Sequence, residues 1–162
     1  MVKPNNFGLS NRSGTDALVH LLQLLSDSDP DLVITSIDGV GAFDHIARAR
    51  IFEQLLANTE LNDFVPFVKL WYDAPTLYKW EDDNGKTHDI LQGDGGEQGD
   101  ALMPALFCLA LKPALDRIRL LLPPGCYVFA YLDDIYVIAP ADDTRRCYDI
   151  VSECLKEMSA ST

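Results

Sequence analysis

Apolar residues recur with two different periods along the chain, and these periods predict where strands and helices lie. Runs rich in β-branched and aromatic residues predict strands at residues 32–37, 76–80, 86–91, 127–132 and 135–139. Apolar positions three and four residues apart predict helices at about 14–26, 45–56, 64–71 and 101–122, and in a last segment that includes 147–158. The order of these elements predicts an α+β fold, in which helices pack beside a small antiparallel sheet.

Two adjacent carboxylates interrupt the apolar pattern near the end of the chain. Only Asp133 and Asp134 separate the last two predicted strands, so we expect the pair at the tip of a tight hairpin. Burying adjacent carboxylates without a partner is unfavourable, and a cation that takes oxygen ligands would offset this cost. A solvated turn is the alternative, because Asp is a common turn residue.

A further carboxylate ends an earlier predicted strand. Asp38 follows residues 32–37, and Gly39 and Gly41 then loosen the backbone. A carboxylate at a strand end can point at the hairpin tip of a neighbouring strand, so Asp38 and Asp133 could share a divalent ion. We expect Asp44 to cap the helix that follows.

Residues 93–100 contain too many glycines to form a regular element. Glycine lets a flat substrate approach the backbone closely, and the Gln98 amide offers both a donor and an acceptor. Pro104 fits the first turn of the next predicted helix. A loop without function is the alternative interpretation of this stretch taken alone.

Composition limits the functions that this chain can perform on its own, without a partner or a further domain. The formal net charge is −12, which argues against an autonomous nucleic-acid-binding domain. The cysteines have no zinc spacing, and we expect them to be buried core thiols. The longest apolar run, residues 101–111, is too short to span a bilayer, and the first residues lack a secretory pattern. We therefore expect an intracellular protein without a membrane partner.

Three stretches together carry a specific resemblance: Asp38 to Asp44, Gly95 to Phe107 with Gln98-Gly99, and Tyr131-Leu-Asp133-Asp134. In this order and spacing they resemble the palm of reverse transcriptases, with its first catalytic aspartate, its QG motif and its YxDD hairpin. Residues 5–17 resemble the entry segment that precedes the palm in non-long-terminal-repeat retroelements and group II intron enzymes. The resemblance covers residues 5 to about 140.

The resemblance implies RNA-directed DNA synthesis, with dNTP, primer and an RNA or DNA template as partners. It implies that Asp38 and Asp133, with the Gly39 carbonyl, bind two Mg²⁺ ions. Asp134 is then a supporting third carboxylate, since adjacent strand residues point to opposite faces. It also implies that Phe43 is the aromatic steric gate against ribonucleotides, and that Gln98 and Gly99 line the nucleotide pocket. Core packing is the alternative for Phe43.

The resemblance is to part of a larger enzyme. We expect residues 1–30 to be an entry segment of the fingers and residues 31–162 to be the palm, with upstream finger strands and the thumb missing. Met103 replaces a serine that is usual in the family. Two alternatives stay open: a catalytically inactive palm remnant, and a nucleotide-cyclase-like palm suggested by Gly95-Gly-Glu97. The oligomeric state is not predicted.

Overall fold

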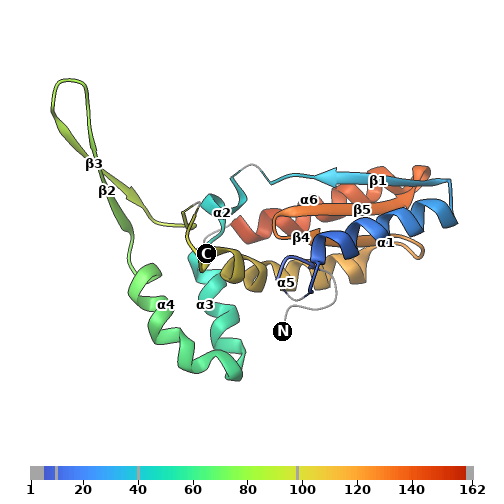
Figure 1. The fold of residues 1–162 in the computed structure, drawn as a ribbon, viewed down its shortest axis with the longest axis horizontal. Coiled ribbons are helices and arrows are strands. Elements are labelled where there is room, and N and C mark those ends of the chain that lie inside the picture. Colours follow the sequence, from blue (N-terminus) through green and yellow to red (C-terminus); the bar gives the residue numbers. More distant parts are fainter. Residues whose placement is uncertain (1–5, 10, 40, 98, 160–162) are drawn as a thin grey trace.

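A small antiparallel sheet forms the centre of the molecule (Figure 1). The structure, a computed structural model, describes residues 6–9, 11–39, 41–97 and 99–159. The sheet has the strand order β1-β5-β4, with bounds Leu32–Ile37, Asp134–Pro140 and Tyr127–Tyr131. The central strand β5 therefore pairs with a strand far away in sequence on one side and with its own hairpin partner on the other.

Helices cover the sheet because strand residues alternate between its two faces. Ile135, Val137 and Ala139 are buried in the main core, which they share with α5 (Met103–Leu121) and α6 (Thr144–Ser159). The alternation turns Ile138 to the other face, where it is also fully buried. Helix α1 (Gly14–Ser28) contacts the two edge strands β1 and β4. The mixed fold that the sequence predicts is confirmed.

The middle of the chain leaves the sheet and returns to it (Figure 1). It contains two helices that follow β1, a short 3-10 turn, one more helix and a projecting hairpin. Their bounds are Ala42–His45 for α2, Arg48–Ala57 for α3, Thr59–Phe64 for η1, Val65–Tyr72 for α4, Thr76–Glu81 for β2 and Thr87–Gln92 for β3. A further 3-10 turn, η2 (Ala141–Asp143), leads into α6. Helix α3 packs on α5, whereas the β2–β3 hairpin extends away from the body.

The tip of the β4–β5 hairpin differs from the prediction by one residue. Tyr131 pairs with Asp134, so the turn consists of Leu132 and Asp133, and Asp134 is the first residue of β5. A turn this tight needs a positive φ, and Leu132 supplies it with a φ of 55°. Local propensity favours Asp over Leu at such a position, so the sequence alone pointed to the wrong pair.

The cysteines are free thiols, as predicted. Cys108, Cys147 and Cys154 are buried and Cys126 is half-buried. Burial raises the pKa of the Cys108 thiol to about 12. In the part of the chain that the structure describes, no helix combines the length and the apolar character needed to cross a membrane.

Candidate active site

Three carboxylates meet at one end of the central sheet. Asp38 directly follows β1, Asp133 lies in the hairpin turn and Asp134 begins β5. The β1–β5 register pairs Ile37 with Ile135, and its continuation by one residue sets Asp38 opposite Asp134. The antiparallel pairing therefore brings together side chains that are about a hundred residues apart in sequence.

The three negative charges influence one another. Asp134 is exposed, but partial desolvation raises its pKa, and the nearby charges of Asp133 and Asp38 raise it further. Bringing like charges together disfavours the ionised form, and a cation between them would favour it again. Within the described ranges, however, no three Asp, Glu, His or Cys side chains form a group that could hold a metal ion as they stand.

The donor types at this end of the sheet suit Mg²⁺, which prefers carboxylate and carbonyl oxygens. Asp38 and Asp133 supply two carboxylates, and Gly39 supplies a carbonyl. The Gly39 carbonyl already accepts a hydrogen bond of 3.0 Å from the Ala42 N–H, which leaves its second lone pair for a ligand. The chemistry of the donor set fits the ion that the resemblance implies.

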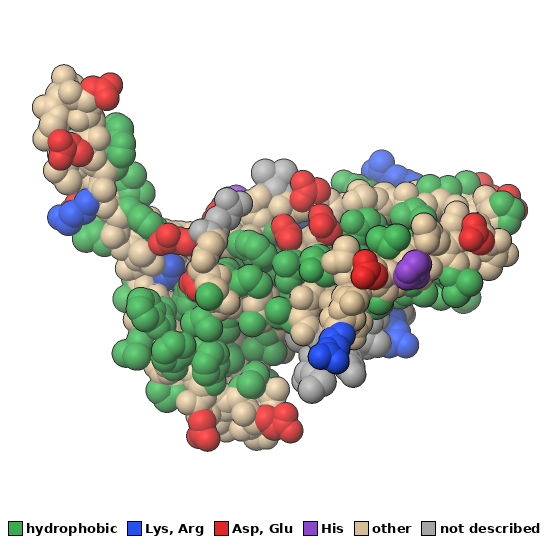
Figure 2. Space-filling model, in the orientation of Figure 1, with side chains coloured by type: hydrophobic (Ala, Val, Ile, Leu, Met, Phe, Trp, Pro, Cys, Tyr) green, Lys and Arg blue, Asp and Glu red, His purple; other side chains and the backbone are tan. Residues whose placement is uncertain are grey.

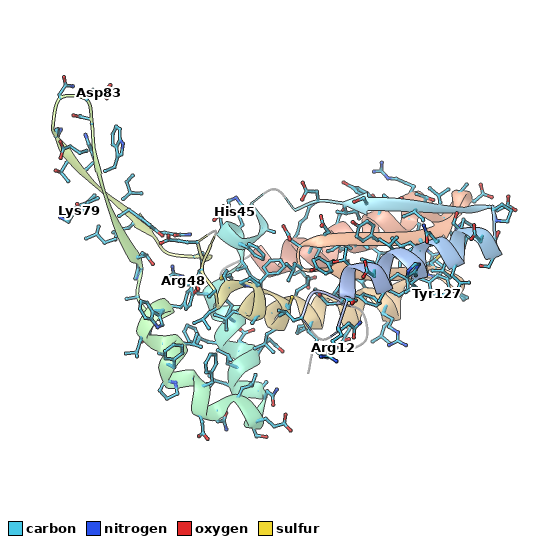
Figure 3. The ribbon with its side chains drawn as sticks, viewed as in Figure 1. Arg12, His45, Arg48, Lys79, Asp83 and Tyr127 are labelled. Carbon is cyan, nitrogen blue, oxygen red and sulfur yellow. The ribbon has the colours of Figure 1, made fainter. Side chains whose placement is uncertain are left out.

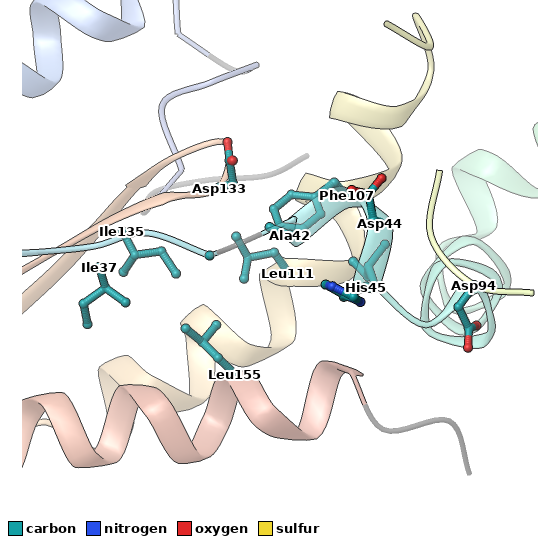
Figure 4. A pocket seen from close by; sticks show the side chains of 12 residues that line it. Ile37, Ala42, Asp44, His45, Asp94, Phe107, Leu111, Asp133, Ile135 and Leu155 are labelled. Carbon is teal, nitrogen blue, oxygen red and sulfur yellow. The ribbon is translucent and has the colours of Figure 1, made fainter. Parts of the chain in front are cut away.

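A cavity of about 370 Å³ lies beside the carboxylates (Figure 4). Gly39 and Asp133 line one part of it, and Asp44, His45 and Asp94 line another. The remaining lining is apolar and comes from the sheet, from α2 and its C-cap Ile46, and from α5 and α6. The cavity is thus polar and acidic where α2, the hairpin turn and the glycine-rich loop approach it.

The glycine-rich loop lies directly against α2. The Gly95 N–H donates to the Ile46 carbonyl at 2.9 Å, and the Gly96 N–H donates to the Phe43 carbonyl at 3.0 Å. Gly95 has a φ of 71°, and a Cβ there would lie 2.2 Å from the Asp44 carbonyl oxygen. Only glycine permits this contact. The first and second predicted motifs are therefore neighbours in space.

The loop also caps helix α3, and this corrects a prediction. Asp44 does not cap that helix, because it lies inside the short helix α2, and the N-cap position of α3 is Ala47. Instead, the Asp94 carboxylate accepts a hydrogen bond of 3.2 Å from the Arg48 N–H in the first turn of α3. A capping residue 46 positions away gives no local sequence signal.

Tyrosines fix the far end of the same loop. The Tyr72 hydroxyl donates to Asp100, and the Tyr78 hydroxyl donates to Glu97. Burial raises the pKa of Tyr72, and the hydrogen bond to Asp100 raises it further, so the phenol stays protonated. Because the loop connects β3 with α5, Gly95-Gly-Glu97 does not form the tip of a hairpin as in nucleotide cyclases.

The predicted nucleotide-binding residues lie around this loop. Phe43 is half-buried and packs edge-to-face on Phe107, with ring centroids 4.8 Å apart at 83°. Gly99 is exposed and has a φ of 93°. Gln98 lies outside the described residues. The Phe43 ring thus contacts the core while its backbone holds the loop.

Sequence analysis missed the residue that joins the loop to the hairpin. Arg48 is only 6% exposed. Its guanidinium donates to the Gly95 carbonyl at 2.9 Å, the Ala74 carbonyl at 2.7 Å and the Thr76 hydroxyl at 3.0 Å. It also lies 5.4 Å from the centre of the Tyr72 ring. Figure 3 shows Arg48 near the base of the hairpin. Nothing in the local sequence indicates that an arginine in the first turn of a helix is buried.

The fold and the arrangement of the motifs agree with comparison to known proteins. The chain belongs to the reverse transcriptase (RNA-dependent DNA polymerase) family, whose model matches residues 2–162. It is similar to the retrotransposable element SLACS 132 kDa protein of Trypanosoma brucei gambiense, with 23% identity over 125 residues. The match includes 77% of this chain and 10% of the relative, so the chain spans about a tenth of that protein.

Solved structures of telomerase share the fold. An apo telomerase of Candida tropicalis, truncated from the C-terminal domain, matches with a TM-score of 0.66 and 14% identity, over 96% of this chain and 34% of that one. Telomerase of Candida albicans, in complex with a TWJ fragment of telomeric RNA, matches with a TM-score of 0.57 and 13% identity, over 90% of this chain and 29% of that one. The palm-like fold that the motifs implied is confirmed.

Proposed function

We propose that this chain is the palm-centred part of an RNA-directed DNA polymerase encoded by a retroelement. Residues 1–30 are then an entry segment of the fingers and residues 31–162 are the palm. The family match supports the polymerase, and the similarity to a retrotransposable element protein supports the retroelement. The observation that carries the proposal is the convergence of Asp38, Asp133 and Asp134 at one end of the sheet.

The proposed reaction is nucleotidyl transfer. The primer 3′-hydroxyl gives up its proton to water and attacks the α-phosphorus of a dNTP in line. The bond between that phosphorus and the oxygen bridging to the β-phosphorus breaks, and pyrophosphate leaves. Two bound Mg²⁺ ions would lower the pKa of the attacking hydroxyl and stabilise the charge on the leaving group. Asp38 and Asp133 would hold the ions together with the Gly39 carbonyl. Asp134 would support the site through its charge and its place at the start of β5.

The nucleotide would lie between α2 and the glycine-rich loop. Phe43 would fill the space that a ribose 2′-hydroxyl needs, and Gln98 and Gly99 would line the pocket for the base and sugar. The hydrogen bond from Gly96 to the Phe43 carbonyl supports this arrangement, because it fixes the loop beside the proposed gate. The contact of Phe43 with Phe107 would hold the ring of the gate in one orientation.

The template and primer would depend on residues beyond this chain. Lys and Arg side chains are few and separated on the face shown in Figure 2. A net charge of −12 repels a polyanion and disfavours its capture.

Exposed apolar side chains gather over α4 and the lower part of the β2–β3 hairpin (Figure 2). Among them are Phe67, Leu70, Trp71, Leu77 and Leu91.

Primer extension on an RNA template tests the proposal. We expect negligible extension by residues 1–162 alone, and measurable Mg²⁺-dependent extension when the flanking finger and thumb sequences are present. Asp133→Asn in the longer protein should reduce extension by on the order of 100-fold or more, the scale of losing one preorganised electrostatic group. Asp149→Asn is the control, because Asp149 is exposed on α6 and, within the described part of the chain, forms an ion pair with the exposed Arg145.

The result also separates the enzyme from an inactive remnant. A longer protein that binds Mn²⁺ through Asp133 but extends no primer would be a remnant, and the proposed activity would be wrong. Full activity of Asp133→Asn would show that the carboxylates were assigned incorrectly. Robust extension by residues 1–162 alone would show that the primer is held by this chain itself.

A further inference from the structure

The turn that carries Asp133 has an unusual backbone. Only two non-glycine residues in the described parts of the chain have a positive φ, Ser13 at 51° and Leu132 at 55°. A bulky residue rarely adopts this conformation unless its surroundings hold it there. Leu132 directly precedes Asp133, so a contact that fixes the Leu132 backbone also fixes the position of the Asp133 Cα atom.

The Asn6 side chain supplies that support from the other end of the sequence. Its amide donates to the Leu132 carbonyl and its oxygen accepts from the Leu132 N–H, both at 3.3 Å. The same oxygen accepts from the Gly8 N–H at 3.0 Å. Asn6 is only 2% exposed, so water does not replace these bonds easily. One amide therefore satisfies both backbone groups of the strained residue.

The neighbouring backbone tightens this contact. The Phe7 N–H donates to the Ala130 carbonyl at 2.8 Å, which attaches the segment to β4. A Cβ on Gly8 would lie 2.7 Å from the Leu132 side chain and 2.9 Å from the Leu132 nitrogen. A Cβ on Gly14 would lie 2.0 Å from the Phe7 carbonyl oxygen, so the start of α1 packs against the same segment. Residues 6–8 are thus fixed between the start of α1 and the hairpin turn.

Helix α5 contributes the third side of the pocket around the Asn6 side chain. The Asn6 side chain lies close enough to the fully buried Cys108 thiol to lower the pKa of that thiol, against the larger effect of burial. The negative charge of Asp133 also acts on that thiol. Asn6 therefore joins the entry segment, α5 and the hairpin turn at one point, next to a proposed metal ligand.

We propose that Asn6 is a positioning residue for Asp133, and that the metal affinity of the site depends on the Asn6 amide. The inference rests on the proposed function, since it takes Asp133 as a metal ligand. It goes beyond that function by assigning a task to the entry segment: this segment holds the backbone of the hairpin turn. A residue that only fills the core would affect stability and leave the affinity for metal unchanged in the folded protein.

The test measures Mn²⁺ binding by electron paramagnetic resonance and amide hydrogen exchange in the 162-residue protein. Asn6→Leu keeps a side chain of similar size but removes the donor and the acceptor. Asn11→Leu is the matched control, because Asn11 is exposed in the same segment. Gly8→Ala perturbs the Leu132 turn through a steric contact instead of lost hydrogen bonds, and it replaces Asn6→Leu if that variant does not fold.

We expect Asn6→Leu to raise the Mn²⁺ dissociation constant and the exchange rate of the Leu132 amide, each by about tenfold, the scale of one to two lost hydrogen bonds. Gly8→Ala should change both in the same direction, and Asn11→Leu should change neither. A folded Asn6→Leu protein with unaltered Mn²⁺ affinity would overturn the inference.

Asp133→Asn separates this inference from the proposed function. If Asp133→Asn weakens Mn²⁺ binding and Asn6→Leu does not, the metal site stands and the inference is wrong. If Asp133→Asn leaves Mn²⁺ binding unchanged, the proposed metal site is wrong and with it the link between Asn6 and affinity. In that case the exchange rate of the Leu132 amide still decides whether Asn6 holds the turn.

Discussion

Replacing Arg48 with methionine should strongly destabilise the protein. Methionine keeps an unbranched apolar stem but lacks the guanidinium, which donates to the Gly95 and Ala74 carbonyls and the Thr76 hydroxyl. Hydrogen bonds from a charged group contribute roughly 1.5–3 kcal/mol each. These three bonds share one side chain and are not additive, and desolvating the guanidinium offsets part of their contribution. We therefore expect a loss of about 3–4 kcal/mol, the scale of breaking a buried charged network.

Urea denaturation followed by far-UV circular dichroism measures this change, with an unaltered m-value as evidence that the same cooperative unit unfolds. The control is Arg50→Met, two residues along the same helix. Arg50 is partly exposed and pairs with Glu53 at 3.0 Å, an i, i+3 pair of the kind that contributes about 0.2–0.5 kcal/mol.

The difference in the free energy of unfolding between Arg48→Met and Arg50→Met decides whether the Arg48 network holds the loop. If Arg48→Met and Arg50→Met differ by less than about 1 kcal/mol, a typical single hydrogen bond, the Arg48 network does not hold the loop to the hairpin. Arg48→Lys should fall between the two, because an ammonium cannot reach three acceptors that are spread around a planar fork.

Two further variants test the loop and the proposed gate. Gly95→Ala should cost at least about 3 kcal/mol in urea denaturation, because its Cβ would lie 2.2 Å from a carbonyl oxygen at a φ of 71°. Gly93→Ala, which meets no atom within 4 Å, should cost less than about 1 kcal/mol, and equal losses would contradict the packing of the loop. In the longer enzyme, Phe43→Ala should raise kcat/KM for rNTP relative to dNTP by on the order of tenfold or more. Phe107→Leu loosens the same ring contact from the other side, so it should shift that ratio in the same direction but by less. An equal fall for both nucleotides in Phe43→Ala would show that Phe43 only packs.

Local patterns in the sequence were enough to locate the strands and helices. Each predicted strand and each long predicted helix corresponds to an element whose bounds differ by a few residues at most. These elements are set by periodicity, which any short window of sequence contains. The approach of Asp38 to the hairpin turn was expected from its place at a strand end and from the order of the motifs. The pairing of β1 with β5 that produces it was not predicted.

The predictions that were wrong concern contacts between distant residues. Asp134 was expected in the turn because it and Asp133 alone separate the two apolar runs, but the Asn6 amide binds both backbone groups of Leu132 and supports it in the strained position instead. The cap of α3 was assigned to Asp44, its near neighbour, whereas Asp94 supplies it from the far side of the hairpin. Arg48 was given no role, because only the folded chain shows the carbonyls that surround it.

The base of the projecting hairpin has a consequence for how this protein tolerates change. Thr76 and Gln92 pair where the two strands leave the body, and Arg48 binds the chain on both sides of that point, at Ala74 and at Gly95. We therefore expect changes at the tip of the hairpin to leave the carboxylates in place. Lengthening a surface loop costs little, about 0.6 kcal/mol for each doubling of its length. The turn at Asn84 and Gly85 is thus a permissive place to insert an epitope or a fluorescent tag.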